Sequence, residues 1–282
     1  MHSFKYKKNS LFCEGVKVEE ICKNFNTPFY LYSSKTLINN YKLLHKMLNG
    51  INFLIAYSVK ANSNLSVLKT FAKYGAGADV VSIGELKKAL KAGISNNKIV
   101  YSGVGKTIDE IAFALKNKIE QFNVESIEEL ETIAKIAEQI NTSANIALRV
   151  NPDISAGGHP KISTGKKTDK FGIPISDAKN VYELAKKFKS LKIVGIDIHI
   201  GSQIRKLAPF KKAFKKVLSF CIELDKLGFN IKNIDLGGGI GINYDTDEQD
   251  QKFLIEYTNL IKSTFKNNNK KIILEPGRFL VA

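Results

Sequence analysis

Eight short apolar segments with strand composition alternate along the chain with amphipathic helical segments. Such alternation is typical of parallel strands joined by helical crossovers. Eight strand–helix units close into a (β/α)₈ (TIM) barrel, which commonly takes about 250 residues, and the chain has 282. The fold class is therefore α/β, with one barrel. The expected strands are 53–60, 77–81, 98–101, 120–124, 145–150, 193–200, 231–236 and 271–274.

The ring of helices is complete only if the helical pattern at 33–48 counts as the first helix. The barrel is then expected to run from residue 28 to residue 278. Residues 1–27 contain short apolar pieces but no clear helix, and nothing in the barrel is an obvious partner for them. We assign them to a β-domain, and residues 279–282 to the start of a C-terminal β-domain that is largely absent from this chain.

The chain is strongly basic, with 43 Lys and Arg residues against 27 Asp and Glu and a formal charge of +16. Most lysines fall on the polar faces of expected helices and are not interleaved with aromatic residues. This pattern indicates a solvated surface rather than a nucleic-acid interface. Anionic small molecules would still be attracted to it. Binding of nucleic acid rests on net charge alone, and we expect no such partner.

Membrane and metal functions are also disfavoured. No apolar run approaches the roughly 20 residues that span a bilayer, and the N-terminus lacks the apolar core of a signal peptide. We therefore expect a cytoplasmic protein without a membrane partner. Three cysteines and four histidines are scattered along the chain without the spacing of a zinc site, so we expect no bound metal.

Lys60 ends the first expected strand, within the run Tyr57–Asn62. A lysine ammonium rarely belongs inside a core, and the strand end places it at the rim of the barrel. Two interpretations are open. The side chain reaches water as an ordinary strand-end lysine, or burial lowers its pKa and makes it an amine nucleophile for Schiff-base chemistry. Taken alone, Lys60 favours the first interpretation.

Polar and glycine-rich residues follow other strands, at the barrel end where active sites lie. Gly237–Gly241 follows the seventh strand; its N–H groups can approach a phosphate closely, although a plain tight turn is the alternative. His199 ends the sixth strand and could be an ordinary strand-end histidine. Glu275 and Arg278 follow the eighth and could pair with each other. A nucleophilic lysine, a phosphate loop and a carboxylate in one mouth indicate pyridoxal 5'-phosphate (PLP) as the cofactor.

From residue 28 to residue 278 the chain resembles the fold-type III PLP-dependent decarboxylases, the ornithine/diaminopimelate/arginine decarboxylase family, whose barrel is of the alanine racemase type. The order and number of its motifs carry the resemblance. The string at 199–204 and the loop at 159–172 look most like the diaminopimelate branch. The motifs are YSVKAN (57–62), GADVVSIGEL (77–86), RVNPD (149–153), HPKISTG (159–165), KFG (170–172), HIGSQI (199–204), DLGGGIG (235–241) and EPGR (275–278).

The resemblance implies roles for the residues at the barrel mouth. Lys60 would carry the cofactor as a Schiff base and His199 would stack on its ring, so these two are the expected catalytic residues. Glu275 would meet the pyridine nitrogen, where related racemases place a basic group. Arg278 would face the phosphate and the substrate carboxylate. The other residues expected to bind the cofactor are Ser202, Gly238, Gly239, Pro276 and Gly277.

The reaction that the resemblance implies is decarboxylation of meso-2,6-diaminopimelate to L-lysine and CO₂. Members of the family carry a β-domain beyond the EPGR motif, with a cysteine proton donor and further substrate-binding residues, and their site forms between two subunits. We therefore expect a homodimer, and no activity from the 282-residue chain alone. Another fold-type III amino-acid decarboxylase and a catalytically silent PLP-binding fragment are the alternatives.

Overall fold

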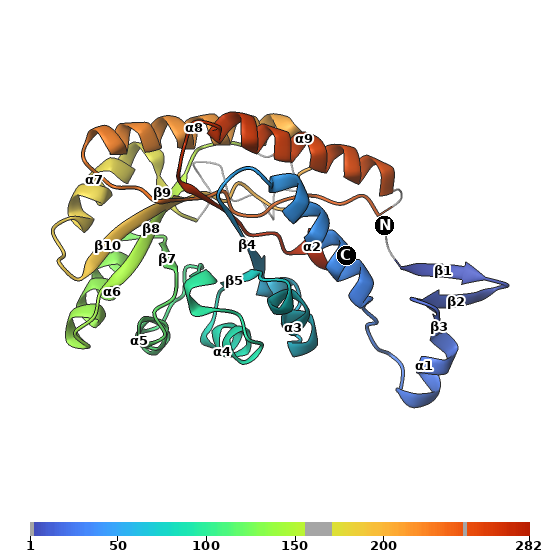
Figure 1. Cartoon of the computed structure of the whole chain (residues 1–282). Helices are drawn as coiled ribbons and strands as arrows, with labels where there is room; N and C mark the ends of the chain where they lie inside the picture. Colours follow the sequence, from blue (N-terminus) through green and yellow to red (C-terminus); the bar gives the residue numbers. More distant parts are fainter. Residues whose placement is uncertain (1–2, 156–170, 245–246) are drawn as a thin grey trace.

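The structure is a computed structural model that describes residues 3–155, 171–244 and 247–282. Within them, eight parallel strands form a closed barrel with helices outside it (Figure 1), as the sequence predicts. Pairing of the first and last strands in the order β10–β11–β12–β4–β5–β6–β7–β8 closes the ring. The strands are β4 (Phe53–Ser58), β5 (Gly77–Val80), β6 (Ile99–Tyr101), β7 (Gln121–Val124), β8 (Ala144–Asn151), β10 (Leu191–Asp197), β11 (Asn233–Asp235) and β12 (Lys271–Leu274).

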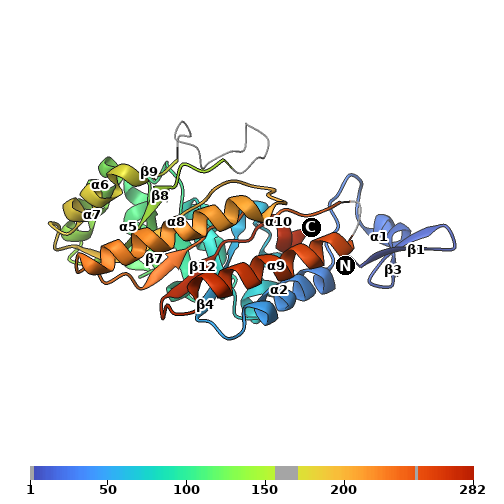
Figure 2. The same cartoon turned by 90° about the horizontal axis from the view of Figure 1, so that it is seen from above.

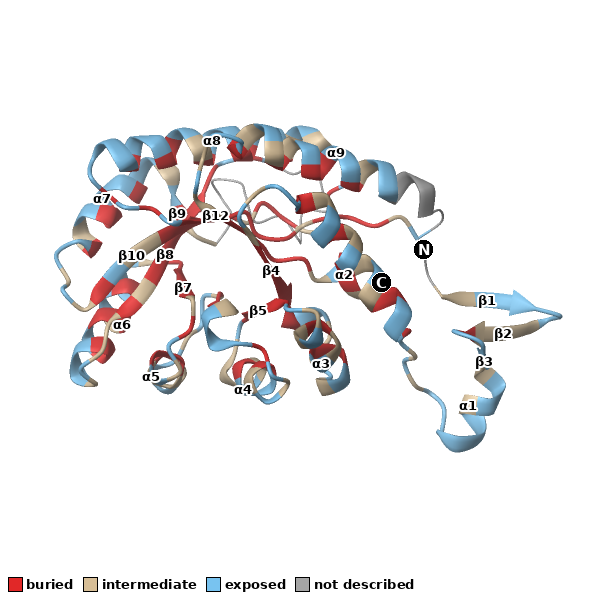
Figure 3. Ribbon diagram, in the orientation of Figure 1, coloured by how far each residue is buried: buried red, intermediate tan, exposed pale blue. Residues whose placement is uncertain are grey.

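The helices bury one face each against the barrel. In α2 (Ser34–Leu48), which takes the place of the first helix, Leu37, Leu44 and Leu48 are buried at the spacing that the sequence pattern predicts. Figure 3 shows the same division elsewhere, with buried residues toward the strands and exposed residues outside. The remaining barrel helices are α3 (Leu65–Lys73), α4 (Ile83–Lys91), α5 (Ile108–Lys116), α6 (Ile127–Gln139), α7 (Ile175–Ala185), α8 (Leu207–Lys226) and α9 (Asp247–Phe265).

The lumen of the barrel carries polar side chains as well as apolar ones. Gln121 and Asn123 alternate along β7, and Asn233 and Asp235 along β11, and all four are buried. Hydrogen bonds join β7 to β11, although neither strand is the other's neighbour in the sheet, so these side chains meet across the lumen. Barrel interiors are usually filled by branched apolar residues. Polar residues in this position must satisfy one another, which gives the lumen a defined hydrogen-bond network.

The N-terminal segment differs from the expectation of a piece without helix or partner. An antiparallel sheet of β1 (Phe4–Lys7), β2 (Ser10–Cys13) and β3 (Val16–Lys17) is followed by α1 (Val18–Asn24). In Figures 1 and 2 this unit projects to one side of the barrel. Helix α1 buries none of its residues and is only seven residues long, so its helical pattern is too short to be distinctive.

The same segment has a partner at the start of α2. The Glu14 carboxylate accepts hydrogen bonds from Ser33 Oγ at 2.6 Å and from Lys35 N at 2.8 Å. Ser33 is also the N-cap of α2, with its Oγ accepting from Thr36 N at 3.0 Å. A carboxylate at a helix N-terminus is favourable, and these bonds lower the pKa of Glu14. They attach the N-terminal unit to the barrel, which the sequence analysis missed.

Two further expectations concern the connections. Most of the polar loop at 151–172, expected to be an active-site loop, lies outside the described residues, together with the HPKISTG motif. The described residues after it include β9 (Ile173–Pro174), a two-residue strand that pairs with β8 and was not predicted. After β12 the chain forms α10 (Arg278–Val281). Among the described residues, no helix is both long and apolar enough to cross a bilayer.

Replacing Lys106 with methionine should lower the free energy of unfolding by about 3 kcal/mol, because a buried charge is left unpaired. Its side chain is 1% exposed, and Nζ lies 2.6 Å from Glu129 Oε1 and donates to the carbonyl oxygens of Gly103 and Asn123. Urea unfolding measures the change. The matched control, Lys179→Met, breaks an exposed pair with Glu223 and should cost less than about 1 kcal/mol. Equal losses in both variants would contradict this role of Lys106.

Candidate active site

A cavity of about 600 Å³ lies at the C-terminal ends of the barrel strands, the end where the sequence places the site. Side chains and backbone from four different strand ends converge on it. The predicted residues that line it are Lys60, His199, Ser202, Gly239, Glu275, Gly277 and Arg278. Gly238 and Pro276 are next to lining residues in the chain but are not themselves part of the lining.

Lys60 lies on a short 3₁₀ turn, Val59–Ala61, just after β4, rather than at the end of the strand itself. Its Nζ forms an ion pair with Asp79 Oδ2 at 2.8 Å; the Lys60 side chain is 52% exposed and that of Asp79 is fully buried. Ser58 Oγ donates to the same oxygen at 2.5 Å. The amine is therefore held at one place on the cavity wall while part of the side chain stays open to the cavity.

The pKa of Lys60 differs from the expectation. Burial lowers it, but the negative charges of Asp79 and Glu275 outweigh burial, and the pKa of Lys60 is raised above its ordinary value. The pKa of Asp79 is lowered despite its burial, because Lys60 and Ser58 stabilise the charged carboxylate. Of the two interpretations left open for Lys60, a pKa lowered by burial does not hold, because Asp79 comes from the neighbouring strand β5, which pairs Asp79 with Ser58. In this state Lys60 is a protonated amine.

The glycine loop after β11 is held in shape by the loop after β10. Ile204 N donates to Gly239 O at 2.9 Å, and Gly241 N donates to Ile204 O at 3.1 Å. The Gln203 side chain also joins the two loops: its amide nitrogen donates to Ile242 O at 2.8 Å, and its amide oxygen accepts from Ile242 N at 3.1 Å. Gly239 has φ +100°, and a Cβ there would lie 2.6 Å from the Gly201 carbonyl oxygen. Only glycine fits this approach.

His199 is partly buried beside the glycine loop. Its Nδ1 accepts a hydrogen bond from Gly238 N at 3.2 Å, so the ring proton of the neutral imidazole belongs on Nε2. Burial, together with the positive charges of Arg149 and Lys60, lowers the pKa of His199 to about 3. His199 is therefore a neutral ring at physiological pH, which suits packing against a flat aromatic group rather than proton transfer through a charged imidazole.

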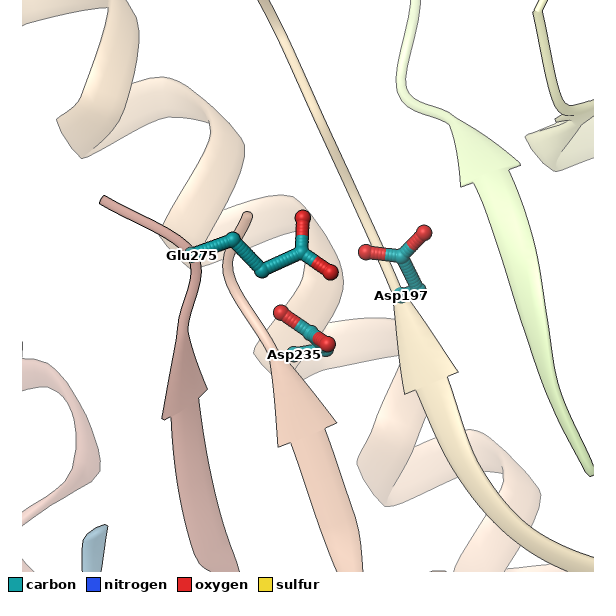
Figure 4. Close-up of side chains that lie close together, drawn as sticks. All are labelled: Asp197, Asp235 and Glu275. Atoms are coloured by element: carbon teal, nitrogen blue, oxygen red, sulfur yellow. The ribbon is translucent and has the colours of Figure 1, made fainter. Parts of the chain in front are cut away.

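Three carboxylates lie close together at the C-terminal ends of neighbouring strands (Figure 4). Asp197, Asp235 and Glu275 end β10, β11 and β12 or follow directly, all three are buried, and one oxygen of each lies within 4.8 Å of the others. Burial raises all three pKa values, that of Asp235 to about 7, and the charge of Asp235 raises those of Asp197 and Glu275 further. Of the three, only Glu275 was predicted from the sequence to belong to the site. The signal that could have identified the two aspartates is their position at the end of an apolar strand, because acidic residues are rarely buried without a partner.

Two positive groups balance part of this charge. Arg149 Nη1 lies 2.8 Å from Glu125 Oε1, and Arg149 Nε lies 4.0 Å from Asp197 Oδ2. Lys60 is the second cation, beside Asp79. Arg149 does not line the cavity, so it acts on the carboxylates around the site and not on a bound molecule directly. Since the carboxylates outnumber these cations, protons are retained in the cluster.

Tyrosines at the cavity rim were missed by the sequence analysis. Tyr30 and Tyr32 precede α2 and line the cavity, with exposures of 91% and 39%. Tyr244 follows the glycine loop, and its hydroxyl accepts from Arg278 Nη1 at 2.6 Å. Arg278 was considered as a possible partner of Glu275; its hydrogen bond goes to Tyr244 instead. No periodic pattern marks these tyrosines, since each stands in a connection rather than in a helix or strand.

A lysine, an open glycine loop and a buried carboxylate lie together at one end of this (β/α)₈ barrel. This combination is typical of barrels that bind PLP. The family described as "pyridoxal-dependent decarboxylase, pyridoxal binding domain" matches residues 34–282, and the chain belongs to this family. The diaminopimelate decarboxylase of Zymomonas mobilis is 43% identical over 285 residues, which cover 100% of this chain and 68% of that protein.

Solved structures agree with this assignment. The diaminopimelate decarboxylase of Helicobacter pylori complexed with L-lysine superimposes with a TM-score of 0.89 at 42% identity, over 94% of this chain and 67% of that one. That of M. jannaschii gives a TM-score of 0.91 at 37% identity, over 99% of this chain and 67% of that one. The chain therefore spans about two thirds of these relatives.

The residues of the cavity fit PLP. Its volume of about 600 Å³ is in the range of small-molecule sites. Within the described residues, the N–H groups of Gly239 and Gly277 have no hydrogen-bond acceptor, so they are available to a phosphate. A Cβ at Gly277 would lie 3.1 Å from Ser58 Cβ and 3.2 Å from Ala61 Cβ, so a side chain there would crowd the turn that carries Lys60.

Replacing Asp79 with asparagine should allow PLP to attach to Lys60 at lower pH. Asp79 raises the pKa of Lys60, and removing an opposite charge at this distance shifts a pKa by about one unit or more. The pH dependence of attachment, followed by absorbance, should move down by that amount. Glu85→Gln removes a charge that makes no contact with Lys60 and should move it less. An unchanged profile in Asp79→Asn would contradict the argument.

Proposed function

We propose that this chain is the PLP-binding barrel of a diaminopimelate decarboxylase, converting meso-2,6-diaminopimelate to L-lysine and CO₂. One observation carries the proposal: Lys60, the glycine loop and Glu275 converge on one cavity in a chain 43% identical over its whole length to a diaminopimelate decarboxylase. The solved relatives complexed with L-lysine hold a compound that is the product of this reaction.

Lys60 is proposed to attach the cofactor through its amine. The amine must first lose a proton, and Asp79, 2.8 Å away, is the nearest carboxylate. Asp79 would then lie beside the nitrogen through which Lys60 holds the cofactor. PLP, when bound, supplies a ring that accepts the electron pair left as CO₂ departs.

Glu275 and His199 are proposed to set the environment of that ring. Glu275 would keep the ring nitrogen protonated, and His199 would pack on the ring face as a neutral imidazole. Ser202 and the N–H groups of Gly239 and Gly277 are proposed to bind the phosphate, with Gly238 and Pro276 shaping the loops. Arg278 is always charged and is placed to bind the phosphate or a substrate carboxylate in exchange for Tyr244.

The proposal is tested by loading the protein with PLP, reducing it with borohydride and mapping the modified peptide. The label is expected on Lys60. CO₂ release by the chain joined to a C-terminal β-domain of the family is then compared for meso-diaminopimelate, ornithine and arginine as substrates, and only the first should be turned over efficiently. Labelling of another lysine would overturn the site, and preference for ornithine or arginine would assign the chain to another branch of the family.

We also propose that the active protein is a cytoplasmic homodimer without a nucleic-acid partner. Support comes from the family resemblance, which implies a site formed between subunits, and from the exposed Tyr30 and Tyr244 at the cavity rim. Analytical ultracentrifugation should give twice the chain mass. A monomer that turns over diaminopimelate at full rate would contradict the shared site.

A further inference from the structure

A chain of side-chain amides crosses the barrel lumen from its N-terminal end to Glu275. At the upper end, Asn123 Nδ2 lies 3.2 Å from Glu275 Oε1, 3.3 Å from Asp235 Oδ2 and 3.1 Å from Ser102 Oγ. All of these side chains are buried. An ionised carboxylate only accepts hydrogen bonds, so the NH₂ end of Asn123 is the correct end to face it.

The other end of the Asn123 amide is occupied from below. Gln121 Nε2 donates to Asn123 Oδ1 at 2.7 Å, and Asn233 Nδ2 donates to Gln121 Oε1 at 2.8 Å. Each amide can bond this way in only one orientation, because its oxygen accepts and its nitrogen donates. The orientation of Asn123 therefore follows from that of Gln121, which in turn follows from Asn233.

The lower end of this chain is anchored by an ion pair at the opposite mouth of the barrel. Asn233 Nδ2 also donates to Glu120 Oε1 at 3.0 Å, and the same oxygen lies 2.5 Å from Lys271 Nζ. This carboxylate oxygen accepts hydrogen bonds from both donors. It therefore fixes Asn233 as a donor, and with it every amide above.

We propose that Gln121 and Asn233 are positioning residues that act on the cofactor through Asn123: they hold its NH₂ end toward Glu275, so that Glu275 faces the cofactor ring nitrogen as an ionised carboxylate. The proposal rests on the proposed function, in which Glu275 meets that nitrogen.

The charges around Glu275 explain why its carboxylate needs a fixed hydrogen-bond donor. Burial raises the pKa of Glu275, and the charges of Asp235, Asp79 and Asp197 raise it further. These effects favour a neutral carboxyl, which stabilises a protonated ring nitrogen less. Hydrogen bonds donated to the charged form oppose them. If Asn123 were free to turn, its oxygen would face Glu275 and favour the neutral carboxyl instead.

The test is the protonation of the cofactor ring in the PLP-loaded protein, read from the nitrogen-15 shift of ring-labelled PLP. Asn123→Leu removes the donor itself and should lower the ratio of protonated to unprotonated nitrogen by about tenfold or more, the worth of one hydrogen bond to a charged group. Gln121→Met keeps the shape but loses the donor to Asn123, and should move the ratio the same way by about threefold.

Asn145→Leu is the matched control. Asn145 is another asparagine near Glu120, but its Nδ2 donates to the Glu120 backbone carbonyl and not to the amide chain. This variant should leave the nitrogen-15 shift unchanged whatever it does to stability. If Gln121→Met does not fold, Asn233→Ala serves in its place, since Asn233 lines an open cavity at the lower mouth where water can replace the side chain.

A nitrogen-15 shift in Gln121→Met or Asn233→Ala equal to that of Asn145→Leu would overturn the inference. Failure of the proposed function is distinguishable, because borohydride would then not fix the cofactor on Lys60 of the unaltered protein. If the label is on Lys60 and the nitrogen-15 shifts are identical, the row of amides fills the lumen without affecting the cofactor.

Discussion

In the chain extended by a C-terminal β-domain of the family, Lys60→Ala is expected to abolish covalent attachment of PLP and to lower decarboxylation by about 10³-fold or more, because the only amine held in the cavity among the described residues is removed. Borohydride should fix no label, and lysine formation should fall to the background rate. Mass spectrometry of the reduced protein and a lysine assay measure the two effects.

The control is Lys88→Ala. Lys88 is exposed on α4 and donates to Ser63 Oγ at 2.9 Å, near the turn that carries Lys60, but it does not line the cavity. Attachment and turnover should both be retained in this variant. A Lys60→Ala protein that still takes up the label and turns over substrate would show that another lysine carries the cofactor.

In the same extended protein, Glu275→Gln should lower turnover by about 10²-fold or more while the dissociation constant for PLP changes by less than about tenfold. The neutral amide stabilises a protonated ring nitrogen less, and about 1.4 kcal/mol lost in the transition state costs a factor of ten in rate. The stability should hold or rise, because the substitution removes one of three carboxylates that repel each other. Steady-state kinetics, a PLP titration and thermal unfolding separate these effects.

Asp197→Asn is the matched comparison for Glu275→Gln. It removes the same charge from the same cluster, but Asp197 does not line the cavity. A smaller loss of turnover is expected. Equal losses in the two variants would mean that the total charge of the cluster, and not the position of Glu275, controls the reaction.

The barrel was predictable from the sequence because its signals are local. Each strand is a short apolar run, and each helix repeats its buried residues at helical spacing, as Leu37, Leu44 and Leu48 do. The N-terminal unit escaped because α1 buries no residue and its sheet strands are two to four residues long. Its attachment through Glu14 joins residues about 20 positions apart, which no periodic pattern records.

The sequence by itself determined the alternation that makes a barrel and the set of residues after its strands, including Lys60, Gly239 and Glu275. A residue that follows a strand lies at the same mouth as its counterparts whatever the details of packing. Only the tertiary structure decided how these groups affect one another. Asp79 raises the pKa of Lys60, and Asp235 and Asp197 raise that of Glu275, because electrostatic interactions depend on distances across the lumen. The orientation of the Asn123 amide was decided in the same way, by partners on strands that are neighbours in neither sequence nor sheet.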